Sequence, residues 1–197
     1  MLRDYSPLNF SALRAGSPYA QPTQNLVESV SLSDPALDVM TDLRRVATVI
    51  ILSGDSVEEA HRRMIQRGVR LLLVVDQNRQ VVGVITAVDI LGEKPMQVVS
   101  HRGIRREELL VRDVMTPQER LQVLDLEDVR KAKVGHIVST LKQEGRQHAV
   151  VVERHAAQRQ VVCGLFSSTQ IARRLGVSIP TTEVARTFSE IEAQLAR

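Results

Sequence analysis

Residues 38–41 read Asp-Val-Met-Thr, and residues 113–116 repeat the same tetrapeptide 75 positions later. After each copy come an apolar stretch and a helical pattern, and these patterns end at Gly68 and Gly145. Self-similarity over an interval of this size indicates an internal duplication. The chain is therefore predicted to contain two related units of roughly 55 to 65 residues, near the lower limit for independent folding.

Local patterns in the first unit predict the element order β-α-β-β-α. The β-branched residues 46–51 predict a buried strand, and a capping box at Ser56 predicts the start of a helix that Gly68 ends. The apolar runs 71–75 and 81–85 flank a turn-forming segment and predict a hairpin. A short second helix is expected to follow directly.

The second unit repeats this order. Apolar positions between 134 and 141 have helical spacing, and residues 148–153 and 161–166 predict the matching hairpin. Three strands with two helices leave one sheet face uncovered, so each unit needs a partner. The expected fold class is α/β, of the α+β kind, with two tandem β-α-β-β-α repeats packed sheet to sheet.

The expected organisation has five parts. The N-terminal part contains three prolines and no periodicity, which is typical of a flexible arm. Near the other end, Val184, Phe188, Ile191 and Leu195 fall on one face of an amphipathic helix. The predicted parts are the arm (1–24), the first repeat with its lead-in (25–93), a charged linker (94–112), the second repeat (113–176) and the C-terminal helix (177–197).

Composition excludes several classes of protein. Hydrophobic residues make up 43% and charged residues 25% of the 197 residues, which is globular composition. The single Cys163 rules out a disulfide framework, and no apolar run is long enough to cross a bilayer. We therefore expect a cytoplasmic protein without a membrane partner. The formal net charge is +3, although residues 1–37 and 177–197 each carry a net −1, so an anion site is expected between them.

No motif for catalysis or metal binding is visible. The five histidines lack ligand spacing, and the sequence contains no phosphate-binding loop, dinucleotide-binding turn or nucleophile elbow. We therefore expect no enzymatic activity, no metal and no cofactor.

Two further stretches identify a family. Residues 83–89 read Gly-Val-Ile-Thr-Ala-Val-Asp, and residues 164–170 read Gly-Leu-Phe-Ser-Ser-Thr-Gln. With the repeated Asp-Val-Met-Thr, residues 38–176 resemble a tandem pair of cystathionine-β-synthase-type (CBS) domains, the Bateman module. The first copy matches the family pattern of Ser or Thr followed three residues later by Asp, whereas Gln170 replaces the acid in the second.

The resemblance implies an adenosyl ligand in the cleft between the repeats: AMP, ADP, ATP or S-adenosylmethionine. It assigns phosphate and ribose contacts to Thr86 and Asp89, and a carboxylate suits ribose hydroxyls because it accepts hydrogen bonds strongly. The alternative is that both residues only cap a helix. The predicted ligand-binding residues are Thr86, Asp89, Arg70, Val69, Leu72 and Val49, with a degenerate second site at Ser167, Gln170, Arg146 and His148.

These expectations point to a regulatory protein that senses its ligand and signals to a separate, unidentified effector protein. CBS pairs commonly associate, so the resemblance also implies a homodimer. Three alternatives remain open: a structural homodimerisation module with empty sites, a cyclic-dinucleotide binder and a nucleic-acid binder. The last would use the basic linker, but the linker lacks the aromatic residues and the long basic run that nucleic-acid binding favours.

Overall fold

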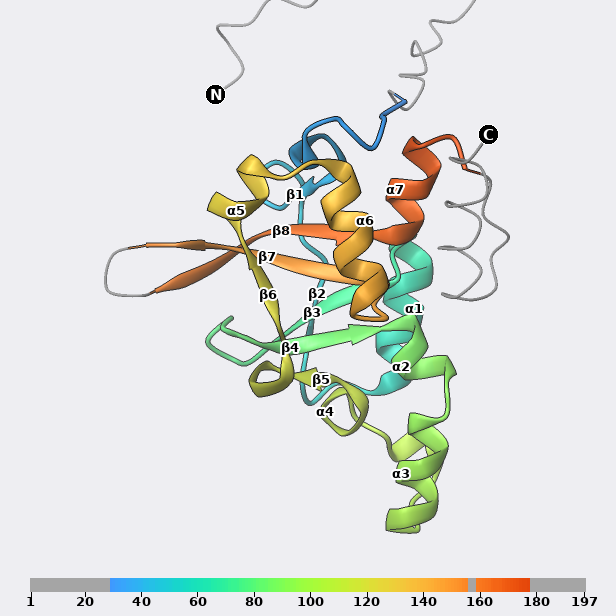
Figure 1. Ribbon diagram of the computed structural model, residues 1–197. Helices are drawn as coiled ribbons and strands as arrows, with labels where there is room; N and C mark the ends of the chain where they lie inside the picture. Colours follow the sequence, from blue (N-terminus) through green and yellow to red (C-terminus); the bar gives the residue numbers. More distant parts are fainter. Residues whose placement is uncertain (1–28, 156–158, 178–197) are drawn as a thin grey trace, which may run out of the picture.

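The computed structural model describes residues 29–155 and 159–177. The predicted N-terminal arm and residues 178–197 of the predicted C-terminal helix lie outside the described residues. Figure 1 shows two lobes, one above the other, each with its own sheet and helices. No helix in the described ranges combines the length and the apolar character that crossing a membrane requires.

The first lobe, lower in Figure 1, contains the elements of the first repeat and of the predicted linker. They are β2 (Ile50–Leu52), α1 (Val57–Arg67), β3 (Leu71–Val75), β4 (Val81–Thr86), α2 (Ala87–Leu91), α3 (Lys94–Arg102), the 3₁₀ turn η2 (Arg106–Glu108), α4 (Val111–Val114) and β5 (Thr116–Pro117). The predicted linker is thus largely helical and packs on this lobe.

The second lobe combines the lead-in of the chain with the second repeat. Its elements are the 3₁₀ turn η1 (Ala36–Val39), β1 (Thr41–Asp42), β6 (Val123–Asp125), α5 (Leu126–Lys131), α6 (Val134–Gln143), β7 (His148–Arg154), β8 (Gln160–Ser167) and α7 (Ser168–Arg174). The 3₁₀ turn η3 (Gln118–Arg120) connects the lobes. The two β-α-β-β-α repeats predicted from the sequence are confirmed, with α5 as an addition.

The two repeats exchange their Asp-Val-Met-Thr segments. The sheet of the first lobe has the order β2-β3-β4-β5, and that of the second has the order β1-β8-β7-β6. Thr41, in the lead-in of the first repeat, therefore pairs with Leu165 of the second, while Thr116 pairs with Val84 of the first. Each repeat completes the sheet of the other, so neither sheet is made by one repeat alone.

The exchange of segments explains on steric grounds why a glycine recurs in both repeats. A Cβ atom at Gly83 would lie 2.4 Å from the Thr116 carbonyl oxygen, and one at Gly164 would lie 2.5 Å from Sδ of Met40. Both contacts come from the exchanged segments. A glycine at these strand positions allows the neighbouring segment to approach closely.

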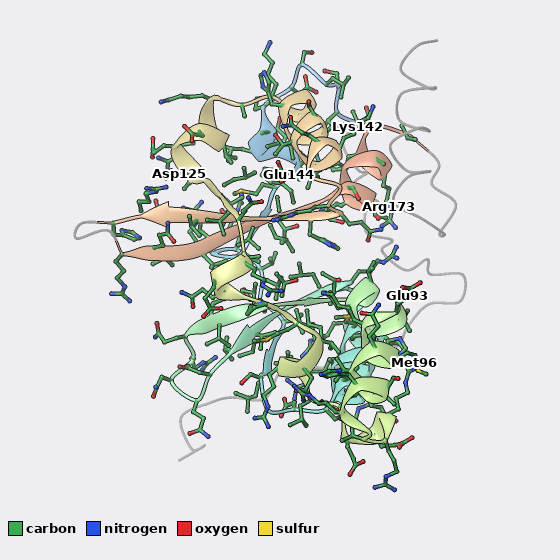
Figure 2. The ribbon with its side chains drawn as sticks, turned by 60° about the horizontal axis from the view of Figure 1, so that its bottom comes forward. Glu93, Met96, Asp125, Lys142, Glu144 and Arg173 are labelled. Carbon is green, nitrogen blue, oxygen red and sulfur yellow. The ribbon has the colours of Figure 1, made fainter. Side chains whose placement is uncertain are left out.

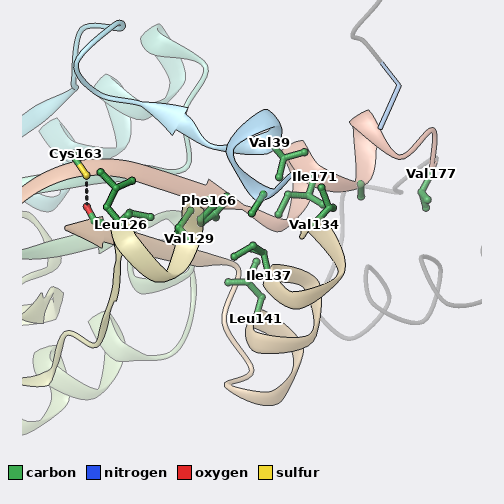
Figure 3. Close-up of a cluster of buried hydrophobic side chains, with 13 residues drawn as sticks. Val39, Leu126, Val129, Val134, Ile137, Leu141, Cys163, Phe166, Ile171 and Val177 are labelled. Carbon is green, nitrogen blue, oxygen red and sulfur yellow. Dashed lines mark hydrogen bonds between the residues drawn. The ribbon is translucent and has the colours of Figure 1, made fainter. Parts of the chain in front are cut away.

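Three apolar cores hold the molecule together. One lies under the helices of the first lobe and includes Leu72, and a second lies under those of the second lobe around Phe166 (Figure 3). The third lies between the sheets, where Leu71 and Leu73 pack in one cluster with Val150. The predicted sheet-to-sheet packing is confirmed, and the alternation of side chains along β3 explains how one strand serves two cores.

The strand predicted over residues 46–51 is shorter than expected. β2 begins at Ile50, and the preceding residues Val46 to Val49 leave the sheet and line a pocket between the lobes. Their β-branched pattern reflects contact with this pocket and with the core of the first lobe, against which Val49 packs. The sequence pattern alone does not show whether such residues form a strand or only contact a pocket and a core.

Candidate ligand-binding pocket

A pocket of about 1200 Å³ opens where the two lobes meet. This volume is slightly above the range of roughly 300 to 1000 Å³ typical of small-molecule sites. Its walls are formed by Thr41, Leu43, Val46, Ala47, Thr48, Val49, Arg67, Gly68, Val69, Arg70, Leu71, Leu73, His148, Leu165, Ser167, Thr169, Gln170, Arg173 and Arg174. Both lobes contribute, so a ligand held here would contact both repeats.

The pocket is strongly basic. Arg67 and Arg70 flank the end of α1, and Arg173 and Arg174 come from the last turn of α7. Figure 2 labels Arg173 on α7 of the second lobe. Among the residues that the structure describes, no Asp or Glu lines the pocket. Within the described ranges, Arg67, Arg70 and Arg173 form no ion pair or side-chain hydrogen bond. A cluster of such arginines favours the binding of an anion.

Arg174 and Gly68 organise the rim of the pocket. Arg174 donates a hydrogen bond from Nη1 to the Asp38 carbonyl oxygen at 2.5 Å, which links α7 to the lead-in. Gly68 ends α1 with φ = 63°, a left-handed conformation that glycine adopts without strain. The turn that follows places Val69 and Arg70 on the pocket wall.

His148 lies on the pocket wall at the start of β7. Burial and the nearby Arg70 guanidinium lower the pKa of His148 to about 4, while the Asp89 carboxylate acts in the opposite direction. The imidazole is therefore neutral near pH 7. In that form it offers one hydrogen-bond donor and one acceptor to a ligand.

The uncharged polar side of the pocket comes from the second copy of the motif. Ser167 and Thr169 carry hydroxyls, and Gln170 accepts a hydrogen bond from Oγ1 of Thr41 at 3.0 Å. Thr41 belongs to the exchanged Asp-Val-Met-Thr segment. Sequence reasoning missed Thr41 as a pocket residue, although the repetition of its tetrapeptide was the strongest signal in the chain.

Thr86 and Asp89 do not line this pocket. Asp89 is only 7% exposed, and its Oδ2 accepts hydrogen bonds from the Thr86 backbone N–H at 2.9 Å and from Thr86 Oγ1 at 2.7 Å. The Asp89 N–H donates to Thr86 Oγ1 in return, which completes a capping box at the start of α2. Both side chains thus have internal partners, and their predicted ligand role stays a prediction.

The pocket joins residues that the sequence analysis divided between two sites. Val49, Val69 and Arg70, predicted for the first site, line it together with Ser167, Gln170 and His148 of the second. The exchange of segments between the lobes explains this grouping, since it brings the end of one repeat beside the start of the other.

Besides Thr86 and Asp89, two further predicted residues lie outside the pocket. Leu72 was expected to line an adenine pocket, but it is 0% exposed and packs in the core under the helices of the first lobe. It points away from the pocket because alternate residues of a strand face opposite sides, and its neighbours Leu71 and Leu73 take the pocket side. Arg146 follows α6 and does not line the pocket.

Sequence reasoning also gave no pocket role to Arg173. A basic residue in the last turn of a helix is favoured by the helix dipole, so its presence there does not by itself indicate a ligand. Its position three residues after Gln170 on α7 is the signal that places both side chains near one cleft.

Two other groups of residues carry no visible ligand chemistry. Cys163 is buried in the second lobe, where burial raises the pKa of its thiol, and its Sγ lies 3.6 Å from the Val151 carbonyl oxygen (Figure 3). Among the residues that the structure describes, no group of three or more His, Cys, Asp or Glu is arranged to hold a metal ion.

Comparisons with known proteins agree with this architecture. Residues 27–95 match the family model of the CBS domain. An uncharacterized conserved protein from Pyrococcus horikoshii has a similar structure, with a TM-score of 0.53 and 20% identity over 78% of this chain and 100% of that chain. A CBS-domain containing protein from Agrobacterium tumefaciens has a TM-score of 0.53 and 16% identity, covering 80% and 98% of the two chains.

A third similar structure is the CBS domain pair of protein MJ0100, in complex with 5′-methylthioadenosine and S-adenosyl-L-methionine. It has a TM-score of 0.50 and 18% identity, over 74% of this chain and 98% of that chain. No curated protein gives a significant match. Residues 27–95 thus match a CBS domain, and the two repeats together have the fold of a CBS pair.

Proposed function

We propose that this chain is a regulatory protein, not an enzyme, that binds an adenine nucleotide in the pocket between its lobes. One observation carries the proposal: Arg67 and Arg70 of the first lobe and Arg173 of the second line one pocket, and among the described residues no carboxylate lines it. A phosphate-bearing ligand would supply the missing negative charge through charge-assisted hydrogen bonds. The CBS pair with bound adenosyl ligands supports the adenosyl class.

The lining suggests how such a ligand would lie. Val49, Val69 and Leu165 offer apolar surface to the adenine, and Gln170 offers polar atoms to the ribose. The arginines would then hold the phosphates. AMP, ADP and ATP fit this charge distribution, whereas the sulfonium of S-adenosylmethionine would add a cation to a basic pocket. We therefore expect S-adenosylmethionine to bind more weakly than the nucleotides.

Regulation would follow from the shared pocket. A ligand that contacts both lobes stabilises the arrangement in which their arginines converge, and it shifts the population towards that arrangement. A separate effector protein would then respond to this arrangement. We also propose that the signalling unit is a homodimer, because α1 and α2 expose apolar side chains: Ile65 at 69%, Leu91 at 63% and Val88 at 51%.

Calorimetric titration of the full chain with ATP, ADP, AMP, adenosine and S-adenosylmethionine tests the ligand. We expect nucleotide affinity to exceed that of adenosine, and we expect Arg70→Ala and Arg173→Ala each to weaken ATP binding about tenfold. Arg106→Ala is the matched control, since Arg106 is exposed on η2 and outside the pocket. If no nucleotide binds, the chain is better explained as a structural dimerisation module.

Titration with a cyclic dinucleotide and with nucleic acid tests the other ligand classes in the same way. A cyclic dinucleotide that binds more tightly than ATP would replace the proposed ligand. Binding of single-stranded or duplex nucleic acid that weakens steeply with salt and is lost in Arg106→Ala would indicate use of the predicted linker instead.

A further inference from the structure

Helices α1, α2 and α3 carry an exposed apolar patch. Among the described residues, the four large apolar side chains with the highest exposure all lie on these helices: Ile65 on α1, Val88 and Leu91 on α2, and Met96 on α3. Helix α2 packs against both α1 and α3, and Leu91 and Met96 line one groove. We refer to these four residues as the exposed patch. Apolar side chains gathered in this way on adjoining elements mark an interaction surface.

The helices of the second lobe have no comparable patch within the described residues. On that lobe the lead-in of the chain packs along the helices, with Val30 and Leu32 against the core. The Val30 N–H donates to the Arg174 carbonyl oxygen of α7, and the Gly135 N–H of α6 donates to the Leu32 carbonyl oxygen, both at 2.9 Å. A segment from one end of the chain thus packs on the helices of one lobe, and the exposed patch lies on the other lobe.

The chain leaves the described residues beside α1. Val177 is buried in the core of the second lobe, three residues after α7 ends at Arg174. Arg174 and Arg67, the last residue of α1, line the same pocket. A run of six residues such as 178–183 spans at most about 20 Å, roughly twice the diameter of a helix. A helix that begins at Val184 can therefore reach α1 and α2.

The sequence of residues 178–197, which we call the C-terminal segment, suits the exposed patch. Val184, Phe188, Ile191 and Leu195 share one face of the helix that the sequence predicts, along about 16 Å of its length. Arg186 and Arg197 fall on the opposite face of this predicted helix. The C-terminal segment carries a formal net charge of −1, from two arginines against three glutamates. Helices α1, α2 and α3 together carry +2, from five Lys or Arg against three Asp or Glu, so the two attract each other.

From these observations we propose that residues 184–195 form a helix whose apolar face docks on the exposed patch of the same chain. Docking removes apolar surface of both partners from water, which stabilises the contact. Part of the patch is the surface on which the homodimer is proposed above, so the C-terminal segment and a second copy of the chain compete for it. This competition rests on the proposed function, whereas the docking itself does not.

Paramagnetic broadening in NMR spectra of the full chain tests the docking. A spin label on Arg197→Cys is expected to broaden the methyl signals of the exposed patch, and wild type treated with the label controls for the buried Cys163. Phe188→Glu should abolish this broadening. Ala193→Glu is the matched control, since it places the same charge on the opposite face of the predicted helix and should leave the broadening unchanged.

Two results of this experiment would overturn the docking. One is the absence of broadening at the exposed patch. The other comes from mixing spin-labelled chains with isotope-labelled chains that carry no spin label: broadening in that mixture would show that the segment docks on a second copy instead.

Sedimentation tests the competition separately. Phe188→Glu is expected to strengthen self-association about tenfold, because it frees the patch for a second copy, and Ala193→Glu should have no effect. Equal self-association of wild type and Phe188→Glu would overturn the competition. If all three proteins are monomeric, the proposed homodimer fails together with the competition, while the broadening still decides whether the segment docks.

Discussion

Single residues explain why this duplication was visible in the sequence. Gly83 and Gly164 occupy equivalent strands, and each allows the exchanged segment of the other repeat to approach. The sequence shows that the glycines recur. The contacts that require them come from residues 33 positions downstream and 124 positions upstream, so no local pattern reveals them.

The two glycines are expected to differ in their tolerance of alanine. At Gly83 the new methyl group would meet backbone, the Thr116 carbonyl, whereas at Gly164 it would meet the flexible end of Met40. We expect Gly83→Ala to lower the free energy of unfolding by roughly 2 to 3 kcal/mol and Gly164→Ala by less than about 1 kcal/mol. Urea denaturation measures both, and equal losses would contradict this steric account.

His148 is expected to make stability sensitive to mild acid. In the folded protein its pKa is about 4, so it stays neutral while an unfolded histidine takes up a proton near pH 6.5. The unfolded state therefore gains protons first, and stability falls as the pH is lowered from 8 to 5 by about 2 kcal/mol. His148→Gln should flatten this part of the curve of unfolding free energy against pH. An unchanged slope would indicate that His148 titrates normally.

At the scale of elements, helices α1 and α6 and the two hairpins follow from local signals, whereas α3 lies in the segment predicted as a linker. Helix α1 is capped at its start by Ser56, whose side chain accepts a hydrogen bond from the Glu59 N–H at 3.1 Å, and at its end by Gly68. Both boundaries were predictable because capping is a local interaction. The two-residue strands β1 and β5 were not predictable. So short a run has no periodicity, and the sheet that it joins depends on residues far away in the sequence.

The cap of α1 supports a prediction at this scale. Ser56→Ala removes the acceptor for the Glu59 N–H, and we expect a loss of about 1 kcal/mol in unfolding free energy. Ser56→Asp should retain most of the stability, because aspartate is also a good N-cap. Thermal unfolding of the wild type and the two variants checks this order of stability. A Ser56→Asp variant that is less stable than Ser56→Ala would contradict it.

At the scale of the whole molecule, the exchange of β1 and β5 determines what can fold. The core of the first lobe includes Leu109, Val111 and Val114, all beyond the end of the first repeat as the sequence delimits it. We expect a fragment of residues 44–120, which contains this core and β5, to unfold cooperatively on heating. A fragment of residues 25–93 lacks β5 and these three core residues and should not, as circular dichroism would show. The reverse result would argue against the exchange as a source of stability.

The sequence by itself determined the duplication, the element order, the α/β class and the resemblance to a CBS pair, because repeats, caps and apolar alternation are local or periodic features of a chain. Only the tertiary structure decided which repeat completes which sheet, that Leu72 faces a core while Val69 and Arg70 face a pocket, and that Asp89 pairs with Lys94. These outcomes depend on contacts between the repeats and on the fold of the segment that joins them. The motif alone therefore indicated a ligand site, and packing decided which of the predicted residues line the pocket between the lobes.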